Sequence, residues 1–304
     1  MPSAIVSRCA DECARSRAGA NVTRMGALLL VATPIGNLGD LSPRAVEAFK
    51  EADVIAAEDT RVVRRLLSHA GVAAGARLRA VHASNERAEA TRIVEEVRGG
   101  ALVVYASDAG MPGISDPGEV LVRACVEAGM PVEVVPGPSA LLAALVLSGL
   151  PTARFAFEGF LPRKGVARRE RLEEISRSRV TVVVFESPRR VVATLDELSA
   201  ALDPLRRVAV ARELTKLFEE VRRGPVGEVA DAVRAAGDPR GEHVIVIAPA
   251  EVEQADATDG EIEVALAEAM EAGATASKAA ASVAALLGVP KRRAYELATR
   301  LRHA

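Results

Sequence analysis

The sequence predicts an α/β protein with two successive α/β units, the first built on a parallel sheet and the second on a mixed sheet, followed by a small helical module. Through the first 150 residues, short apolar strands alternate with amphipathic helices, as in a parallel sheet with helices on its faces. Between residues 152 and 250, several strands follow one another without a helical crossover, which indicates antiparallel pairing. Beyond residue 261 the pattern is helical alone.

The chain divides where its composition changes. Residues 1–24 have neither the apolar core of a signal peptide nor a periodic pattern, and Met25 leads directly into a strand. We expect them to be dispensable, either as a disordered extension or because the true start of the protein is Met25, rather than a functional arm. The acidic segment 251–260 is expected to be a flexible linker. The predicted domains are 25–150, 151–250 and a helical module at 261–304.

Local signals set the elements of the first unit. Ser42 and Pro43 predict a helix start, because a serine hydroxyl accepts from the unpaired N–H groups of a first turn and proline fits that turn. Asp116, Pro117 and Glu119 have the spacing of a capping box, which predicts a helix with Pro117 at its first position. The expected strands span 28–33, 54–57, 78–81, 102–107 and 132–135, and the other expected helices lie around Leu66, at 85–97 and at 139–149.

The second unit and the terminal module follow the same logic. A Gly288-Val289-Pro290 turn joins the last two helices, and the second of them opens with basic residues, which is typical of a helix-turn-helix. The expected strands span 155–160, 180–185, 208–212, 220–223 and 243–248, and the expected helices span 166–176, 188–202, 226–236, 261–272, 277–287 and 291–302.

Three glycine-rich turns, each directly after a predicted strand, are the strongest functional signal. They occupy residues 34–40, 108–118 and 136–140. Ligands of open α/β sheets bind outside the carboxyl ends of the strands, so the three turns predict one binding crevice. None has the glycine spacing of a dinucleotide fingerprint or a phosphate loop. We therefore expect a small ligand contacted mainly by backbone groups.

Composition narrows the class of protein. Of 304 residues, 49% are hydrophobic and 26% charged, and no apolar run approaches the roughly 20 residues of a membrane span. Three cysteines exclude a disulfide framework and indicate a reducing, cytoplasmic setting. Cys9 and Cys13 have no further cysteine or histidine nearby, so no metal site is expected.

Charge is uneven near the end of the chain. Residues 251–271 contain eight acidic and no basic side chains, whereas residues 272–304 contain six basic and one acidic. An acidic segment followed by a basic helical module indicates a polyanionic partner.

Eight motifs, in order, carry a resemblance to a known family. They are ATPIGNLGD from Ala32, AEDTR from Ala57, SDAGMP from Ser107, ISDPG from Ile114, PGPSA from Pro136, GFLPRK from Gly159, FESPRR from Phe185 and ARELTK from Ala211. Together they resemble the bacterial RsmI family (ribosomal RNA small subunit methyltransferase I), within the tetrapyrrole-methylase-like enzymes that use S-adenosylmethionine. The resemblance covers about residues 26–250.

The resemblance implies a two-domain enzyme of tetrapyrrole-methylase type, usually a homodimer, with S-adenosyl-L-methionine in the interdomain cleft. It implies 2′-O-methylation of a cytidine ribose in the decoding region of 16S ribosomal RNA, so the small ribosomal subunit is the expected partner. The family often has a histidine two residues after the ELTK lysine. This chain has Phe218 there, so a histidine base at that position is absent.

The donor is a zwitterion with a sulfonium centre. Asp108 and backbone carbonyls would offset its positive charges, and glycines would admit its close approach. The expected donor-binding residues are Pro34, Ile35, Gly36, Asn37, Asp108, Gly110, Gly113, Pro138, Ser139 and Ala140.

A ribose hydroxyl is a weak acid, so a carboxylate or a lysine is the expected base. Glu58 and Asp59 end a strand at the crevice, although capping of the next helix explains them equally well. Glu213 and Lys216 in the second unit are rivals, as is Glu186. The sequence does not choose among them.

Basic pairs are the expected phosphate contacts. The terminal cluster ranks first because it opens a helix after a turn, and a further pair at Arg168 and Arg169 is a weaker candidate. The predicted RNA-binding residues are Arg163, Lys164, Arg189, Arg190, Lys291, Arg292 and Arg293.

Two other functions remain open. A methyltransferase acting on a corrin or porphyrin would share the fold but would not need so many arginine pairs. A non-catalytic nucleic-acid-binding regulator would use the helix-turn-helix but would leave the three turns unexplained.

Overall fold

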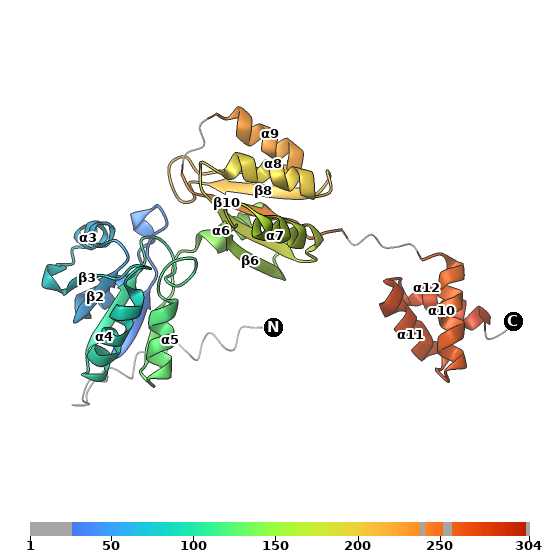
Figure 1. Ribbon diagram of the computed structural model, residues 1–304, viewed down its shortest axis with the longest axis horizontal. Coiled ribbons are helices and arrows are strands. Elements are labelled where there is room, and N and C mark those ends of the chain that lie inside the picture. Colours follow the sequence, from blue (N-terminus) through green and yellow to red (C-terminus); the bar gives the residue numbers. More distant parts are fainter. Residues whose placement is uncertain (1–25, 238–240, 252–256, 302–304) are drawn as a thin grey trace.

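A computed structural model of the chain describes residues 26–237, 241–251 and 257–301. The expected extension 1–24 and the core of the expected linker therefore lie outside the described residues. Two five-stranded sheets and a terminal group of three helices make up the structure (Figure 1). Within the described ranges, no helix has the length and apolar character that crossing a membrane requires.

The first sheet is wholly parallel, as predicted, with strand order β3-β2-β4-β1-β5. The entirely buried β1 lies between β4 and β5, the two strands of this sheet that come last in the chain. The strands are β1 (Ala27–Val31), β2 (Val54–Ala57), β3 (Leu78–Ala80), β4 (Leu102–Ala106) and β5 (Val132–Val135).

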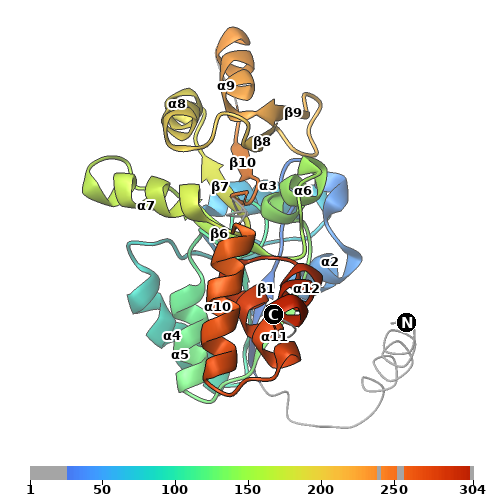
Figure 2. The ribbon, with the colours of Figure 1, turned by 90° about the vertical axis from the view of Figure 1, so that its right-hand side faces the viewer.

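Helices cover both faces of this sheet. Phe49 and Leu67 pack on one face beneath α2 (Pro43–Glu51) and α3 (Thr60–His69). Ile93 and Leu121 pack on the other beneath α4 (Glu86–Arg98) and α5 (Glu119–Glu127), which lie side by side in Figures 1 and 2. As predicted, the Ser42 hydroxyl caps α2, accepting from the Ala45 N–H. Two short 3-10 helices, η1 (Leu38–Asp40) and η2 (Gly75–Arg77), complete the unit.

The predicted capping box before α5 is wrong. The helix begins at Glu119, two residues later than expected, and Gly118 at φ 136° precedes it with no side-chain cap of its own. The cap comes instead from α4, where the buried Glu86 carboxylate accepts from the N–H groups of Gly118 (2.7 Å) and Val120 (3.1 Å). A distant carboxylate thus supplies what the local sequence was expected to supply, and Asp116 is left for another role.

The second sheet is mixed, as predicted, with order β6-β7-β10-β8-β9; β6 and β7 are parallel and the other pairs are antiparallel. Its strands are β6 (Phe155–Phe160), β7 (Thr181–Glu186), β8 (Arg207–Arg212), β9 (Glu220–Pro225) and β10 (His243–Ile247). Three helices, α7 (Val166–Arg177), α8 (Val191–Ala201) and α9 (Val226–Ala235), cover one face around Leu195 and Ile245.

The other face of the second sheet is covered by α6 (Ala140–Ser148), which contacts β8 and β10. This helix precedes residue 150 and was expected within the first unit. Its N-terminus follows the turn after β5, so α6 carries the chain from one sheet to the other. Ile35 and Leu214 join the same apolar cluster, which closes the junction between the sheets.

The terminal helices are α10 (Asp259–Glu271), α11 (Ala276–Leu287) and α12 (Lys291–Leu301). They pack around Ile262, Leu266 and Leu297 and lie apart from both sheets in Figure 1. Helix α10 begins at Asp259, inside the segment expected as linker, because Thr258 and Glu261 form a capping box.

Candidate functional site

A cavity of about 420 Å³ lies between the two sheets, at the carboxyl ends of the first-sheet strands. Its first-sheet wall comes from the residues that follow β1, β2, β4 and β5, so the three predicted turns meet at one cleft. The second-sheet wall is β6, β7 and β10. The cavity is lined by Ile35, Glu58, Asp108, Ala109, Gly110, Met111, Ile114, Ser115, Asp116, Ser139, Ala140, Leu141, Phe160, Phe185, Glu186, Ser187, Pro188, Glu242, His243 and Val244.

Five of the predicted donor-binding residues line this cleft: Ile35, Asp108, Gly110, Ser139 and Ala140. Gly110 has φ +82° and exchanges both backbone hydrogen bonds with Thr33, which ties the second turn to the first. Ser139 caps α6 by accepting from the Leu142 N–H. The first two turns are therefore joined by the Gly110–Thr33 hydrogen bonds, and the third is fixed by the start of α6.

The other five do not line this cavity. Pro34 and Gly36 face a neighbouring cavity, and the Asn37 side chain is used as the cap of η1, where it accepts from the Gly39 N–H. Gly113 shapes its own turn, at φ +82° and with its N–H donated to Pro117 O. Pro138 lies behind Gly110, with its carbonyl 3.7 Å from where a Cβ at residue 110 would stand.

Carboxylates dominate the polar part of the cleft. Burial raises the pKa of Glu58, and the nearby charge of Asp108 raises it further. Burial likewise raises the pKa of Asp108. For Asp116, burial and then the charges of Glu58, Asp108 and Glu242 raise the pKa to about 7. A cluster of carboxyl groups with raised pKa values is suited to a positively charged ligand, because the charge of the ligand stabilises their ionised form.

The loop that carries Asp116 is held at both ends. Ser115 has φ +62°, and its hydroxyl lies 3.2 Å from where a Cβ of Gly159 on β6 would stand. At its other end, Glu86 holds the Gly118 N–H. Sequence reasoning missed three ionisable residues of the cleft, Asp116, Glu242 and His243. Asp116 was missed because its assignment as a helix cap had already explained it.

Asp59 is a structural residue here. Its carboxylate accepts from the Arg61 backbone N–H at the start of α3 (2.8 Å) and pairs with the Arg61 guanidinium (2.7 Å). These bonds lower the pKa of Asp59 to about 2. Its own N–H donates to Asp108 Oδ1 at 2.9 Å, so Asp59 also orients Asp108, and its lowered pKa makes it a weaker candidate base than Glu58.

Glu213 and Lys216 lie together at the far edge of the junction between the sheets. Lys216 Nζ donates to Glu213 Oε1 at 2.8 Å, and both line a small hollow that shares Ile35 and Ala140 with the main cleft. A Cβ on Gly36 would lie 2.5 Å from Lys216 Cγ, so this glycine allows the first turn to pack against the second unit. The ion pair itself lies within the second unit, and its hollow also shares Glu242 with the main cleft.

The carboxylate of Glu186, the other candidate base, is occupied by hydrogen bonds within the second unit. Its side chain is buried and accepts from the Arg190 side chain (2.7 Å), the Thr194 hydroxyl (2.8 Å) and the Ser187 N–H (2.8 Å). Arg190 is therefore a structural partner, which argues against its predicted contact with phosphate. Arg168 is also buried and bonded, to Glu197, Pro162 O and Thr194.

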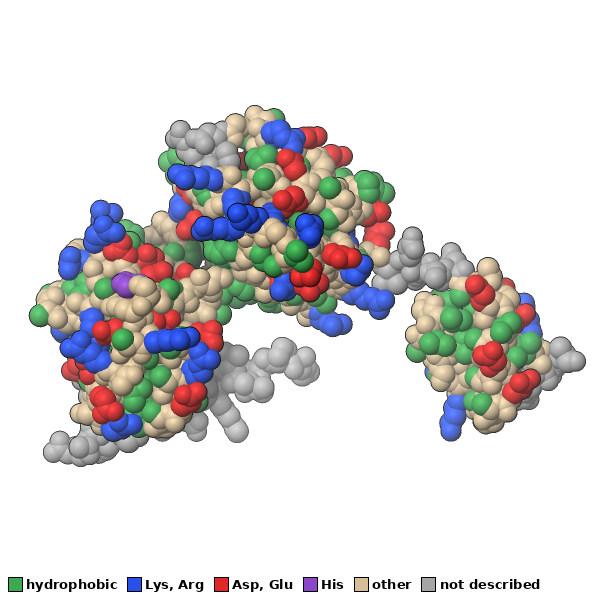
Figure 3. Space-filling view, viewed as in Figure 1, with side chains coloured by type: hydrophobic (Ala, Val, Ile, Leu, Met, Phe, Trp, Pro, Cys, Tyr) green, Lys and Arg blue, Asp and Glu red, His purple; other side chains and the backbone are tan. Residues whose placement is uncertain are grey.

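Of the predicted phosphate contacts, Arg163, Lys164 and Arg189 are exposed around β6, α7 and the turn before α8. In the terminal bundle, Lys291 and Arg292 are exposed at the start of α12, and Arg292 pairs with Glu296. Arg293 is partly buried and bound to Asp259 of α10 at 2.8 Å, which gives it a role in bundle packing. In the view of Figure 3, Lys and Arg side chains are dense on the second unit and sparse on the bundle.

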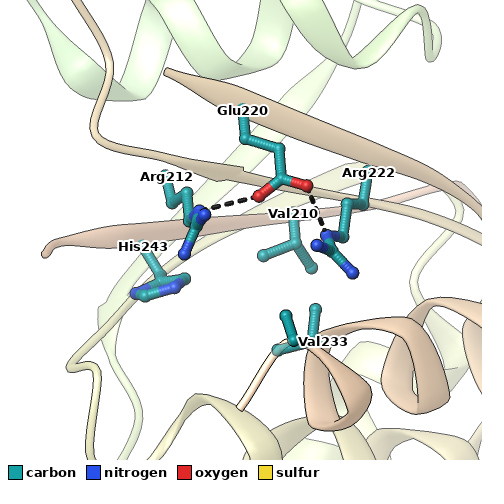
Figure 4. Close-up of a pocket in the computed structure, with 7 residues that line it drawn as sticks. Val210, Arg212, Glu220, Arg222, Val233 and His243 are labelled. Carbon is teal, nitrogen blue, oxygen red and sulfur yellow. Dashed lines mark hydrogen bonds and ion pairs between the residues drawn. The ribbon is translucent and has the colours of Figure 1, made fainter. Parts of the chain in front are cut away.

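His243 lies at the back of the cleft and also lines a small hollow under α9 (Figure 4). There Glu220 pairs with both Arg212 and Arg222, at 2.8 and 2.7 Å. Burial lowers the pKa of His243, and the charge of Arg212 lowers it further. Its Nδ1 lies 3.0 Å from Gly241 O. His243 therefore lies between the acidic cleft and the arginine-rich hollow.

Comparison with known proteins places these features in a family. Residues 27–230 match the model of the Tetrapyrrole (Corrin/Porphyrin) Methylases. The chain is 48% identical over 225 residues to ribosomal RNA small subunit methyltransferase I of Mycobacterium tuberculosis, covering 74% of this chain and 78% of that protein. It is 41% identical over 278 residues to the protein of the same name from Synechocystis, covering 91% and 99%.

Solved structures give the same architecture. The chain superposes on uroporphyrin-III C-methyltransferase from Thermus thermophilus, complexed with S-adenosylhomocysteine, with a TM-score of 0.52 and 26% identity. The match covers 73% of this chain and 97% of that structure. The uncovered part of this chain is large enough to include the terminal bundle.

Proposed function

The chain belongs to the ribosomal RNA small subunit methyltransferase I family, within the tetrapyrrole methylases, and from this premise we propose that it methylates the 2′-hydroxyl of a cytidine in the decoding region of 16S ribosomal RNA. It is a methyltransferase whose methyl donor is S-adenosylmethionine. We propose the specific target: that the modified nucleotide is a cytidine, that the 2′-hydroxyl is the atom methylated, and that this nucleotide lies in the decoding region.

One observation carries this function: a cleft between two sheets whose polar lining is acidic. Glu58, Asp108 and Asp116 all have raised pKa values, so a bound cation would be stabilised by their ionisation. Ile35, Met111 and Phe185 supply apolar walls for the uncharged part of the same ligand. A sulfonium zwitterion has this combination of charge and apolar surface, and it needs no phosphate loop.

When bound, the donor supplies an electrophilic methyl group, and the protein contributes position and charge. The Gly110–Thr33 bridge and the Ser139 cap fix the walls against which the donor would lie. Methyl transfer is an in-line displacement, so the fixed alignment of the hydroxyl with the methyl group supplies much of the rate. The carboxylates supply an acceptor for the hydroxyl proton.

The expected RNA contacts in this proposal are the exposed Arg163, Lys164, Arg189, Lys291 and Arg292. They lie on the second unit and on the terminal bundle. A substrate that meets both must be extended or pre-assembled, which favours the small ribosomal subunit over a short oligonucleotide. Phosphate contacts of this kind make binding fall with salt concentration.

A homodimer is part of the proposal. Helix α6 is apolar on all sides: Ala144 and Leu145 are buried against the second sheet, while Val146 is 71% and Leu142 49% exposed. An apolar surface of this kind on a helix beside the cleft is suited to a second copy of the chain.

The test is methyl transfer from radiolabelled donor to purified small ribosomal subunits, with nucleoside analysis of the product. We expect 2′-O-methylcytidine at one position. A precorrin substrate in a parallel reaction separates the tetrapyrrole alternative, and absence of transfer to either substrate would favour a binding protein without catalysis.

A further inference from the structure

A second cavity, of about 290 Å³, lies beside the donor cleft. One wall is the turn after β1, with Pro34 and Leu38, and the other is α3, with Val62 and Leu66. These walls are largely apolar, as the faces of a flat ring require. Pro34 and Gly36, which the sequence assigned to donor binding, line this second cavity, whereas none of the expected phosphate contacts does.

Asp108 lines both cavities and is the carboxylate they share. Its Oδ1 accepts from the Asp59 N–H at 2.9 Å, which fixes the carboxylate in the wall between them and leaves the other oxygen for a ligand. A group bound in either cavity would therefore meet this carboxylate at their common boundary.

The mouth of the second cavity is basic. Arg65 lines the cavity, Arg64 precedes it on α3 without lining the cavity, and both are exposed. Figure 3 shows Lys and Arg side chains gathered over α3 on the first unit. Apolar walls, one carboxylate at the inner end and cations at the entrance match a nucleoside whose flanking phosphates remain outside.

We propose that this cavity holds the acceptor nucleoside, flipped from the RNA, with its ribose at Asp108 and its flanking phosphates on Arg64 and Arg65. The proposal rests on the proposed function and specifies where the acceptor binds. The cavity is at the small end of ligand sites, roughly 300–1,000 Å³, so its size suits one nucleoside better than a four-ring macrocycle.

The arrangement defines the chemical step. The ribose 2′-oxygen forms its bond to the methyl carbon as the carbon–sulfur bond breaks and leaves its electron pair on sulfur. The hydroxyl proton passes to the Asp108 carboxylate oxygen that does not accept from Asp59. Sulfonium and carboxylate charges are both neutralised, and no other reactant is needed.

The test fills the cavity without altering the donor cleft. Val62 is 38% exposed, so Val62→Trp extends into the second cavity without disturbing the core. The matched control is Val126→Trp on α5, where the valine is 62% exposed and lines none of the described cavities. We expect Val62→Trp to lower kcat/KM for small subunits at least 50-fold, with S-adenosylhomocysteine affinity within twofold of wild type. Val126→Trp should leave both unchanged.

A second measurement does not depend on activity. Binding of a short cytidine-containing single-stranded RNA, followed by fluorescence anisotropy, should weaken at least tenfold in Val62→Trp and in Arg64→Glu/Arg65→Glu. Full activity and RNA affinity in Val62→Trp would overturn the proposal. If wild type transfers no methyl group to small subunits while Val62→Trp still loses RNA affinity, the proposed function fails and the nucleoside site stands.

Discussion

Replacement of Glu86 gives the most specific stability prediction. Its buried carboxylate belongs to α4 but caps the N-terminus of α5. It accepts two backbone N–H groups, at 2.7 Å from Gly118 and 3.1 Å from Val120. Replacing it by alanine leaves both donors unpaired, that of Gly118 buried and that of Val120 partly buried. Each unpaired buried donor costs about 1–3 kcal/mol, and the lost charge at the N-terminus of α5 adds about 0.3–1 kcal/mol.

We therefore expect Glu86→Ala to lower the free energy of opening of the segment 113–122 by about 3–5 kcal/mol. Glu86→Gln retains one acceptor oxygen and should cost about 1–2 kcal/mol. Glu95→Ala is the control: it lies on the same helix, is 64% exposed and pairs only with Arg98, also exposed, so it should cost less than 0.5 kcal/mol.

The assay is hydrogen exchange of the Gly118 and Val120 amides, which reports this segment without requiring two-state unfolding of the whole chain. Donor affinity should fall in parallel, because the same loop carries Asp116 into the cleft. Equal protection of these amides in Glu86→Ala and Glu95→Ala would refute the assignment of Glu86 as the cap.

Three further predictions concern the cleft and the bundle. The pKa of Asp116 is raised from 3.8 to about 7, so the native state retains a proton that the unfolded chain releases between these values. Stability should fall as pH rises from about 4 to 7, and melting of Asp116→Asn across this range should lack that slope. Gly110→Val places a branched side chain at φ +82° in the cleft and should weaken donor binding at least tenfold, about 1.4 kcal/mol, by calorimetry; unchanged affinity would move the donor elsewhere. Lys291→Glu/Arg292→Glu should weaken subunit binding and flatten its salt dependence by about one unit per lost contact, with donor affinity intact; loss of donor affinity alone would contradict this division of roles.

The regular elements could be predicted from the sequence because their signals are local. Apolar runs such as the one at β1 and the Ser42 cap of α2 depend on near neighbours, and both appear where expected. The side on which α6 packs could not be predicted. Its apolar residues face all directions, so periodicity gives no buried face, and only the second sheet selects one.

The cleft was predictable from its turns, but the roles of its residues were not. Asp59 and Arg190 are paired with near neighbours, Arg61 and Glu186, and for Asp59 the sequence already offered the capping role that the structure gives it. Arg168 also looked available in the sequence, yet it is paired with Glu197, which lies 29 positions away in the chain. Asp116 looked committed to a cap and is available, because Glu86 supplies that cap from 32 positions earlier in the chain. Long-range pairing decides such cases, and a single sequence does not record it.

The position of β1 has a consequence for the chain during its synthesis. This strand of five buried residues pairs only with β4 and β5, both of which come much later in the sequence. At about 5–20 residues per second, the roughly 70 residues between Val31 and Leu102 take on the order of 4–14 seconds to emerge. During that interval, the backbone N–H and C=O groups on both edges of this apolar strand have no partner strand. Such unpaired edges promote aggregation between nascent chains on the same polysome. Recombinant yield should therefore respond to chaperones that hold nascent chains, and slower translation before residue 102 should lower it.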